Sequence, residues 1–284
     1  MITFSQIGKI LKEKINSLNA ICLVNQSCNK RFTPIQLYIL TIYLDLFGED
    51  VKENFIAMLT FCDLPNKPEV VNVLEHPNCI FSSIIPYLNK PWYYQFNNSA
   101  IFSTDRKDKL TECFFELSMK NMEEFIKTLL KLPKKSLIQT KQVLEERIKI
   151  EKNVEILDKK LDEGIETINN INIFNKDNLD IKNQLLKKAK TDLINLNNKS
   201  INIKNLITQS INILKKIALN KTVVEFSEES IESLIEFEKE NRIIGWKIRV
   251  EELEAFKQQK KMVKEIYKGE NQKMNYIRQF IEDL

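Results

Sequence analysis

Residues 20–63 read AICLVNQSCNKRFTPIQLYILTIYLDLFGEDVKENFIAMLTFCD, and this stretch predicts a strand, a helix and a second strand. The short apolar run Ala20 to Val24 lies between polar residues, which is typical of a strand buried on both faces. A second apolar run, Phe55 to Phe61, ends at Cys62 and Asp63. Short connections between such elements indicate a right-handed crossover and a parallel sheet.

The segment between the two strands carries the signals of a helix start and a helix stop. Thr33 can cap the helix, Pro34 suits its first position, and Gln36 completes a capping box. The helix is expected to run through the apolar stretch Ile35 to Phe47, as a buried helix, and to stop at Gly48.

A third strand and a long helix follow. Trp92 to Phe96 predicts the strand, which ends in the polar turn Asn97 to Ala100. Residues Leu110 to Leu130 predict an amphipathic helix. Its expected apolar side consists of Phe114, Phe115, Met122, Phe125, Ile126 and Leu129.

Polar residues follow the second and third strands, at the carboxyl edge where ligands bind in parallel sheets. The Asp63 carboxylate can accept hydrogen bonds from the N1–H and the exocyclic amine of guanine. Adenine lacks this pair of donors, so the contact would discriminate between the two bases. The Asn-Ser-Ala turn at 98–100 can direct backbone N–H groups at the guanine carbonyl oxygen. Many strands end in Asp and such turns are common, so each signal alone is weak.

The stretch from Ile15 to about Ile168 resembles the later half of the septin-like, immunity-associated (avirulence-induced) GTPases of the P-loop class. It is most similar to the large members with a coiled-coil tail. The segments that carry the resemblance are Arg31-Phe32-Thr33-Pro34, Leu46-Phe47-Gly48-Glu49-Asp50-Val51, Thr60-Phe61-Cys62-Asp63, Phe96-Asn97-Asn98-Ser99-Ala100-Ile101-Phe102 and Ser136-Leu137 to Arg147.

The resemblance implies a role for two of these segments. In the family, Thr-x-x-Asp is a variant of the base-recognition motif, and Asn-Ser-Ala closes over the base. Carried over, this implies that Thr60 and Asp63 lie in the base-recognition segment, with Asp63 reading guanine. Asn98, Ser99 and Ala100 would form the supporting turn. The implied ligand is GTP or GDP.

The phosphate-binding parts of the family do not occur in this sequence. It contains no GxxxxGK[ST] motif, and no Asp-x-x-Gly precedes Ala20. We therefore expect weak nucleotide binding, no magnesium and no GTP hydrolysis by this chain alone. The first strand would also lack its usual neighbour and present an apolar edge. Either a partner covers that edge or the chain is a fragment of a longer gene product, and we prefer the second explanation.

From Ser136 onward the pattern predicts long helices. One heptad series, interrupted by Ser200 and Ser210, consists of Leu179, Leu186, Leu193, Ile207 and Leu214, with Ala189, Leu196, Ile203 and Ile217 at the complementary positions. A second series, broken by Lys260 and Glu270, consists of Leu253, Phe256, Val263, Tyr267, Met274, Ile277, Ile281 and Leu284. We expect bends at 169–178 and 220–227, with Ser227 capping the last helix. Such spacing fits an oligomerisation stalk or a bundle folded within one chain.

Composition argues against several classes of function. The 43 basic and 39 acidic residues interleave, whereas nucleic-acid-binding proteins gather basic residues on one face. The five cysteines form no CxxC pair, and Cys22 and Cys62 fit buried small hydrophobes. The lone His76 argues against a zinc site.

Reduced cysteines, no signal peptide and no membrane-length apolar run indicate a cytoplasmic protein. Only the basic amphipathic stretch 257–268 favours membrane association, which we do not expect.

The prolines indicate where the architecture changes. Six of the seven lie between Pro34 and Pro91, the seventh is Pro133, and none follows. We predict an incomplete GTPase-like α/β domain over 1–132 and a helical coiled-coil stalk over 133–284. The predicted function is guanine-nucleotide binding without hydrolysis. The alternative is a non-enzymatic coiled-coil scaffold that forms homo-oligomers or binds a protein partner.

Overall fold

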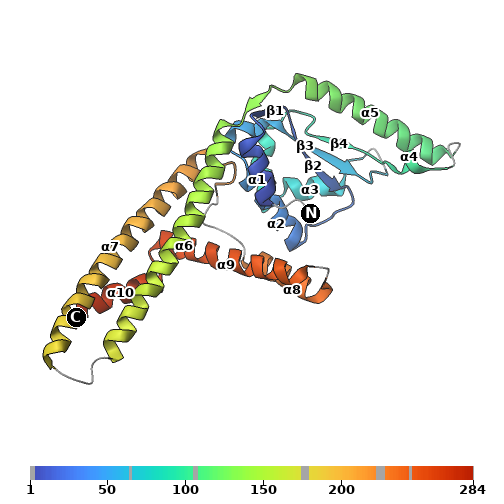
Figure 1. Cartoon of the computed structure of the whole chain (residues 1–284). Helices are drawn as coiled ribbons and strands as arrows, with labels where there is room; N and C mark the ends of the chain where they lie inside the picture. The colour runs from blue at the N-terminus through green and yellow to red at the C-terminus, as the bar shows by residue number, and fades with distance from the viewer. Residues whose placement is uncertain are drawn as a thin grey trace. The chain divides into compact units, whose positions relative to one another are not determined.

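The structure is a computed structural model of the 284-residue chain. It describes residues 4–63, 66–104, 108–173, 179–221, 228–242 and 245–283. Helices dominate, and the chain divides into two compact units (Figure 1). Unit 1 comprises Met1–Leu144, Ile217–Asn220 and Glu229–Leu234, and unit 2 comprises Glu145–Lys216, Lys221–Glu228 and Ile235–Leu284.

Unit 1 contains the predicted parallel sheet, with the strand order β2-β3-β4 (Figure 1). Its strands are β2 (Ile21–Gln26), β3 (Phe55–Thr60) and β4 (Tyr93–Gln95). All three predicted strands and their parallel direction are confirmed. A short antiparallel pair, β1 (Ser17–Leu18) with β5 (Lys135–Ser136), forms a second sheet.

The helix between β2 and β3 begins as predicted and ends earlier. In α2 (Pro34–Asp45), the Thr33 side chain accepts from the Gln36 N–H at 3.3 Å, and the Thr33 N–H donates to the Gln36 side chain at 2.8 Å. This confirms the capping box. The helix stops at Asp45 rather than near Gly48. The other helical segments that precede α5 are α1 (Phe4–Glu13), η1 (Glu49–Asn54), α3 (Glu69–Glu75), η2 (Ile80–Ser83), η3 (Ile85–Tyr87) and α4 (Ser99–Phe102).

Apolar clusters cover the two faces of the sheet. The larger cluster packs around a series of aromatic rings, Phe47, Phe55, Phe81 and Trp92. The first two contacts in the series are edge-to-face, and the contact between Phe81 and Trp92 is tilted. The smaller cluster contains Ile56, Tyr94, Phe96 and Leu132, and the helix α5 (Lys109–Lys131) contributes Phe125 to it. The Phe125 ring lies 5.7 Å from that of Tyr94. α5 therefore packs on β3 and β4.

Two sequence-based expectations about apolar surfaces are wrong. β2 is not buried on both faces, because Cys22 is exposed and Val24 is 66% exposed. The expected apolar side of α5 is also divided, since Phe115, Met122 and Ile126 remain exposed while Phe125 packs on the sheet. Both differences have one cause: the apolar contacts of α5 are with β3 and β4, and β2 is left open.

The helix α6 (Ile138–Ile173) begins in unit 1, where Asp50 holds its first turn. The Asp50 carboxylate accepts from the Gln139 N–H at 3.0 Å, the Thr140 N–H at 3.2 Å and the Thr140 hydroxyl at 2.8 Å. The segment after α7 also belongs to this unit, because the Leu219 N–H donates to the carbonyl of Phe47 at 3.0 Å.

Unit 2 is a set of helices that fold back on one another within the chain (Figure 1). With the rest of α6, its helices are α7 (Leu179–Ile217), part of α8 (Glu228–Asn241), α9 (Trp246–Lys268) and α10 (Gln272–Asp283). Of the predicted heptad positions, Leu193, Ile207 and Leu214 are buried. Ser200 and Ser210 are buried in the same series, at 2% and 5% exposure. The two alternatives were an oligomerisation stalk and a bundle folded within one chain. The structure of this chain contains the bundle.

The expected long last helix is broken. α8, α9 and α10 are separate, and Gly269 ends α9 in the left-handed conformation with φ +76°. Val263, Met274 and Ile277 are buried as expected for the second series. The bend expected from Asn169 begins later, since α6 is helical to Ile173. The proposed cap Ser227, Leu284 and the remainders of both bends (174–178 and 222–227) lie outside the described residues.

Candidate functional site

The two polar loops predicted to form a site meet at the carboxyl edge of the sheet. Asp63 follows β3 and Asn97 follows β4. The Asn97 side-chain amide donates to Asp63 Oδ1 at 2.9 Å. The backbone supports this contact, because the Cys62 N–H donates to the carbonyl of Phe96 at 3.1 Å. The structure therefore brings the loop of Asp63 and the Asn-Ser-Ala turn together.

Asn97 connects the parts of the site. Its side-chain oxygen accepts from the Ser99 N–H at 3.1 Å and from the Ser99 hydroxyl at 2.6 Å. Its backbone N–H donates to the Ser118 hydroxyl on α5 at 2.9 Å, and that hydroxyl lies 3.2 Å from the Asn97 carbonyl oxygen. Asn97 is 4% exposed, so its amide has a fixed orientation toward Asp63.

The Asp63 carboxylate is exposed and only partly engaged. Among the described residues, the hydrogen bond from Asn97 reaches Oδ1, and Oδ2 accepts none. A carboxylate oxygen has two acceptor sites, so the group can accept a pair of donors from a ligand. Asn98 is exposed, and Ala100 is partly buried in α4, whose cap is Asn98.

The Thr60 hydroxyl makes its hydrogen bond within the sheet. It donates to the carbonyl of Asn25 at 3.3 Å, across the pair of strands β3 and β2. This hydrogen bond joins β2 and β3 at the end of the sheet. Thr60 therefore positions the strand that leads to Asp63, and its hydroxyl is not part of the network around the carboxylate.

Sequence reasoning did not assign a role to Phe61, which lies between Thr60 and Asp63. Its φ is +57°, a conformation that bulky residues rarely adopt, and its ring is 61% exposed. The Ser27 hydroxyl donates to the Phe61 carbonyl at 2.6 Å and holds the turn. Strained residues of this kind cluster at ligand sites. The exposed aromatic ring, two residues before Asp63 in the sequence, offers a flat apolar surface.

The two cysteines expected to be buried have different environments. Cys62 is 2% exposed, and burial raises the pKa of its thiol, so the thiol is neutral at pH 7. This confirms Cys62 as a small core residue. Cys22 is exposed, because the face of β2 that carries it is open.

No cluster of three His, Cys, Asp or Glu side chains suited to a metal ion is found in the part of the chain that the structure describes. Within the same residues, no helix combines the length and apolar character needed to cross a bilayer.

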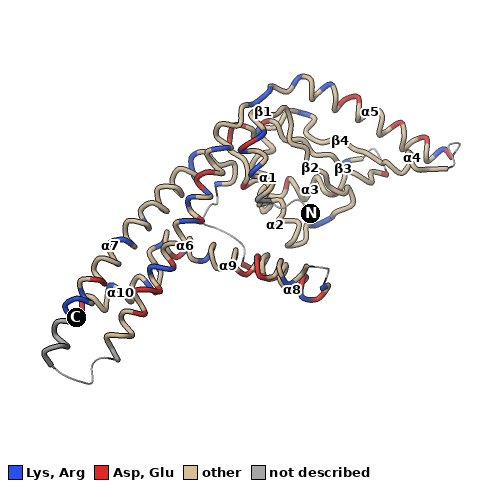
Figure 2. The backbone as a smooth tube through the Cα atoms, viewed as in Figure 1, with Lys and Arg blue, Asp and Glu red and all other residues tan. Residues whose placement is uncertain are grey.

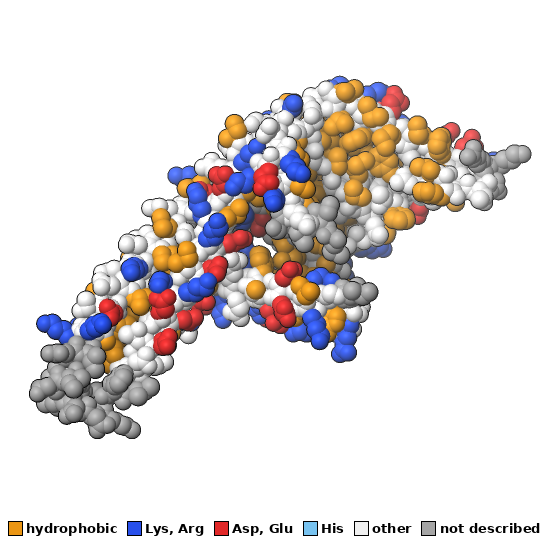
Figure 3. Space-filling model, viewed as in Figure 1, with side chains coloured by type: hydrophobic (Ala, Val, Ile, Leu, Met, Phe, Trp, Pro, Cys, Tyr) orange, Lys and Arg blue, Asp and Glu red, His pale blue; other side chains and the backbone are white. Residues whose placement is uncertain are grey.

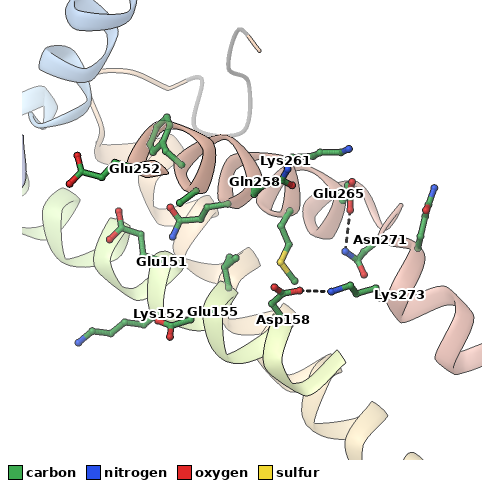
Figure 4. A pocket seen from close by; sticks show the side chains of 16 residues that line it. Glu151, Lys152, Glu155, Asp158, Glu252, Gln258, Lys261, Glu265, Asn271 and Lys273 are labelled. Carbon is green, nitrogen blue, oxygen red and sulfur yellow. Dashed lines mark hydrogen bonds and ion pairs between the residues drawn. The ribbon is translucent and has the colours of Figure 1, made fainter. Parts of the chain in front are cut away.

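Unit 2 contains an open groove of about 1010 Å³ along α6, α9 and α10 (Figure 4). Several of its charged groups pair with neighbours. Lys273 binds Asp158 at 2.9 Å and Asp162 at 2.6 Å, and Asn271 donates to Glu265 at 3.1 Å. These contacts hold α10 against α6 and fix the turn after α9, so these groups are parts of the bundle.

Comparisons of this chain with family models, curated proteins and solved structures returned no match.

Proposed function

We propose that this chain binds a guanine base at the Asp63–Asn97–Ser99 site, as a nucleotide-binding protein that does not hydrolyse GTP. The observation that supports the proposal is the hydrogen bond from the buried Asn97 amide to the exposed Asp63 carboxylate. It connects the two loops that the sequence predicted as a guanine site.

The proposed contact is bidentate. The Asp63 carboxylate accepts the N1–H and the exocyclic amine of guanine, and such charge-assisted pairs are stronger than neutral ones. Asn97 reduces the entropy lost on binding, because it holds the carboxylate in one orientation before the ligand arrives. The Phe61 ring would contact the face of the base.

Affinity in this proposal comes from the base. Because the sequence has no phosphate-binding loop, the triphosphate adds little, and guanosine, GDP and GTP should bind with affinities within about tenfold of one another. The same lack of phosphate and magnesium contacts is the reason that hydrolysis is not proposed.

Calorimetric titration with guanosine, adenosine and xanthosine tests the proposal. Guanosine should bind at least about tenfold more tightly than adenosine. Asp63→Ala should abolish the preference. Asp63→Asn places an amide donor where guanine also has a donor, so it should disfavour guanosine and favour xanthosine, which carries a carbonyl at that position. Equal binding of adenosine, or guanosine binding unchanged by Asp63→Asn, would contradict the proposal.

A second candidate is a scaffold that assembles through its helices without a nucleotide. Exposed apolar side chains on α6 and α7 favour it: Ile156 at 47%, Ile194 at 38% and Leu206 at 49%. This function predicts oligomers that depend on protein concentration, are indifferent to guanosine, and dissociate when Leu206 is replaced by Glu. Sedimentation of the wild type and of Leu206→Glu distinguishes it from the nucleotide-binding function.

A further inference from the structure

The outer side of β2 is unpaired among the residues that the structure describes. The Ser27 N–H donates to the carbonyl of Thr60 on β3 at 2.8 Å. Successive residues of a strand turn their N–H and C=O groups to opposite sides. The main-chain groups of Cys22, Val24 and Gln26 therefore point away from β3. They form a row of donors and acceptors that another strand can use.

This edge lacks the usual protection against pairing. Natural edge strands are blunted by charged side chains, by proline or by bulges. β2 reads ICLVNQ, with no charged residue and no proline, and its six residues pair with β3 in continuous register. A strand of this composition and length is suited to accept a neighbour.

An apolar surface adjoins the edge. The register places Cys22 level with Ile56 and Val24 level with Met58, so these four side chains share one face of the sheet. Phe125 of α5 packs on this face with Ile56 and Met58. Cys22 and Val24 receive no comparable cover and stay exposed.

One flank of α5 extends this surface. Five exposed apolar residues recur along α5 at spacings of three and four, and therefore lie on one side of the helix. They are Phe115 at 51%, Met119 at 53%, Met122 at 38%, Ile126 at 47% and Leu130 at 81% exposure. Figure 3 shows hydrophobic side chains gathered over the sheet and α5.

The character and the size of this apolar surface favour a second copy of the chain as the partner that covers it. The exposed apolar side chains on β2 and on the flank of α5 carry no charge themselves. Acidic and basic residues are interspersed along the rest of α5 (Figure 2), so two identical surfaces meet without a concentration of like charge. The exposed part of these side chains amounts to roughly 600 Å², at the upper end of what monomeric proteins leave in water. With the strand edge added, it approaches the about 800 Å² per partner that stable dimers bury.

In place of the explanation preferred from the sequence, we propose that a partner covers this edge: β2 pairs antiparallel with β2 of a second copy around a two-fold axis, and the two sheets join into one of six strands. An axis perpendicular to the sheet at Val24 places the two Val24 residues opposite each other. Residues that face each other in an antiparallel pair lie on the same face, so Cys22 and Val24 of both copies form one apolar floor. The two α5 helices lie on that same face, one on either side of the floor.

Proline at position 24 tests the strand pairing. Val24→Pro removes an N–H that points away from β3 and leaves the ladder with β3 intact, whereas Val24→Thr keeps the N–H and the branched shape. Sedimentation of the full chain should show a dimer for the wild type and for Val24→Thr. Val24→Pro loses both hydrogen bonds between the two Val24 residues, which should weaken dimerisation about 100-fold. Circular dichroism checks that both variants fold.

A second pair of variants tests the flank of α5. Ile126→Glu places a charge in the apolar surface and should weaken the dimer, whereas Ile138→Glu, at a 73% exposed site on α6, should not. A wild type that is monomeric at all concentrations overturns the proposal. So does a dimer that tolerates Val24→Pro, or one that only Leu206→Glu dissociates, since that outcome assigns association to the helices.

Discussion

At the residue scale, Asn97 makes more of the hydrogen bonds in the candidate site than its neighbours in the turn. It touches Asp63, Ser99 and Ser118, and it is buried, as is Ser118. Sequence reasoning emphasised the Asn-Ser-Ala residues because they match a family motif. The preceding Asn97 lies in the same stretch, and the signal that could have found it is its place directly after the strand.

Replacing Asn97 tests this role. Asn97→Ala removes the amide that orients the Asp63 carboxylate, and it leaves the Ser99 hydroxyl without its acceptor. We expect guanosine affinity to fall about tenfold, equivalent to about 1.4 kcal/mol, measured by calorimetry. Asn78→Ala, at an exposed asparagine outside the turn, is the control and should change affinity little. Similar affinities for Asn97→Ala and the wild type would count against the role of Asn97.

Gly48 was expected to end a helix, but the structure indicates a different reason for a glycine at this position. Its φ is −88°, which any residue adopts, but a Cβ at this position would lie 2.9 Å from the backbone of Gln139 and Thr140. Gly48→Ala should therefore destabilise the protein by about 1–3 kcal/mol in urea denaturation. Gly8→Ala is the matched control, because its Cβ would meet only side-chain atoms at 3.5 Å or more, in a helix that alanine favours. Equal effects of the two substitutions would contradict the close-approach explanation.

At the scale of elements, the break between α8 and α9 is bridged by an ion pair. Arg249 on α9 donates to both oxygens of Glu238 on α8, at 2.8 and 2.7 Å. From the sequence we expected one last helix capped by Ser227, although its apolar series begins only at Leu253, after this break. The chain instead folds back after α8, and a bidentate pair of opposite charges suits two helices held side by side.

This pair makes a predictable contribution to stability as pH changes. The hydrogen bonds from Arg249 hold the pKa of Glu238 below the ordinary glutamate value of 4.5. A carboxyl with a lowered folded-state pKa stabilises the fold above its unfolded pKa, and that stabilisation is lost as pH falls through the folded value. Glu238→Gln should thus be less stable than the wild type at pH 7, with the difference fading below about pH 4.5. Urea denaturation at both pH values measures it, and a constant difference would contradict the prediction.

At the scale of the whole molecule, unit 1 is assembled from three separated segments. Its core includes Leu137 and Leu219, at 0% and 8% exposure, and the Asn220 side chain donates to Asp45 at 2.6 Å. The predicted boundary at residue 132 was based on the distribution of prolines, none of which follows Pro133. Contacts of this kind cannot be inferred from composition, because they join residues far apart in the sequence.

A truncated chain of residues 1–132 tests how much unit 1 depends on the later segments. It lacks Leu137 and Leu219, whose burial contributes about 3–6 kcal/mol. We expect this chain to unfold at much lower urea concentration than the full chain, or not to fold. Urea denaturation followed by circular dichroism of both chains measures the difference. A chain 1–132 as stable as the same unit in the full protein would contradict the expectation.

The sequence by itself determined the local elements: the strands, the capping box of α2, the long helices and the two polar loops that end neighbouring strands. These follow from periodicity, capping and turn residues, which act over a few positions. Only the tertiary structure decided that Asn97 joins the loops, that α5 leaves β2 open, and that the heptad series pack within one chain. The reason is physical, since an apolar pattern indicates that a face will be buried but not which surface buries it.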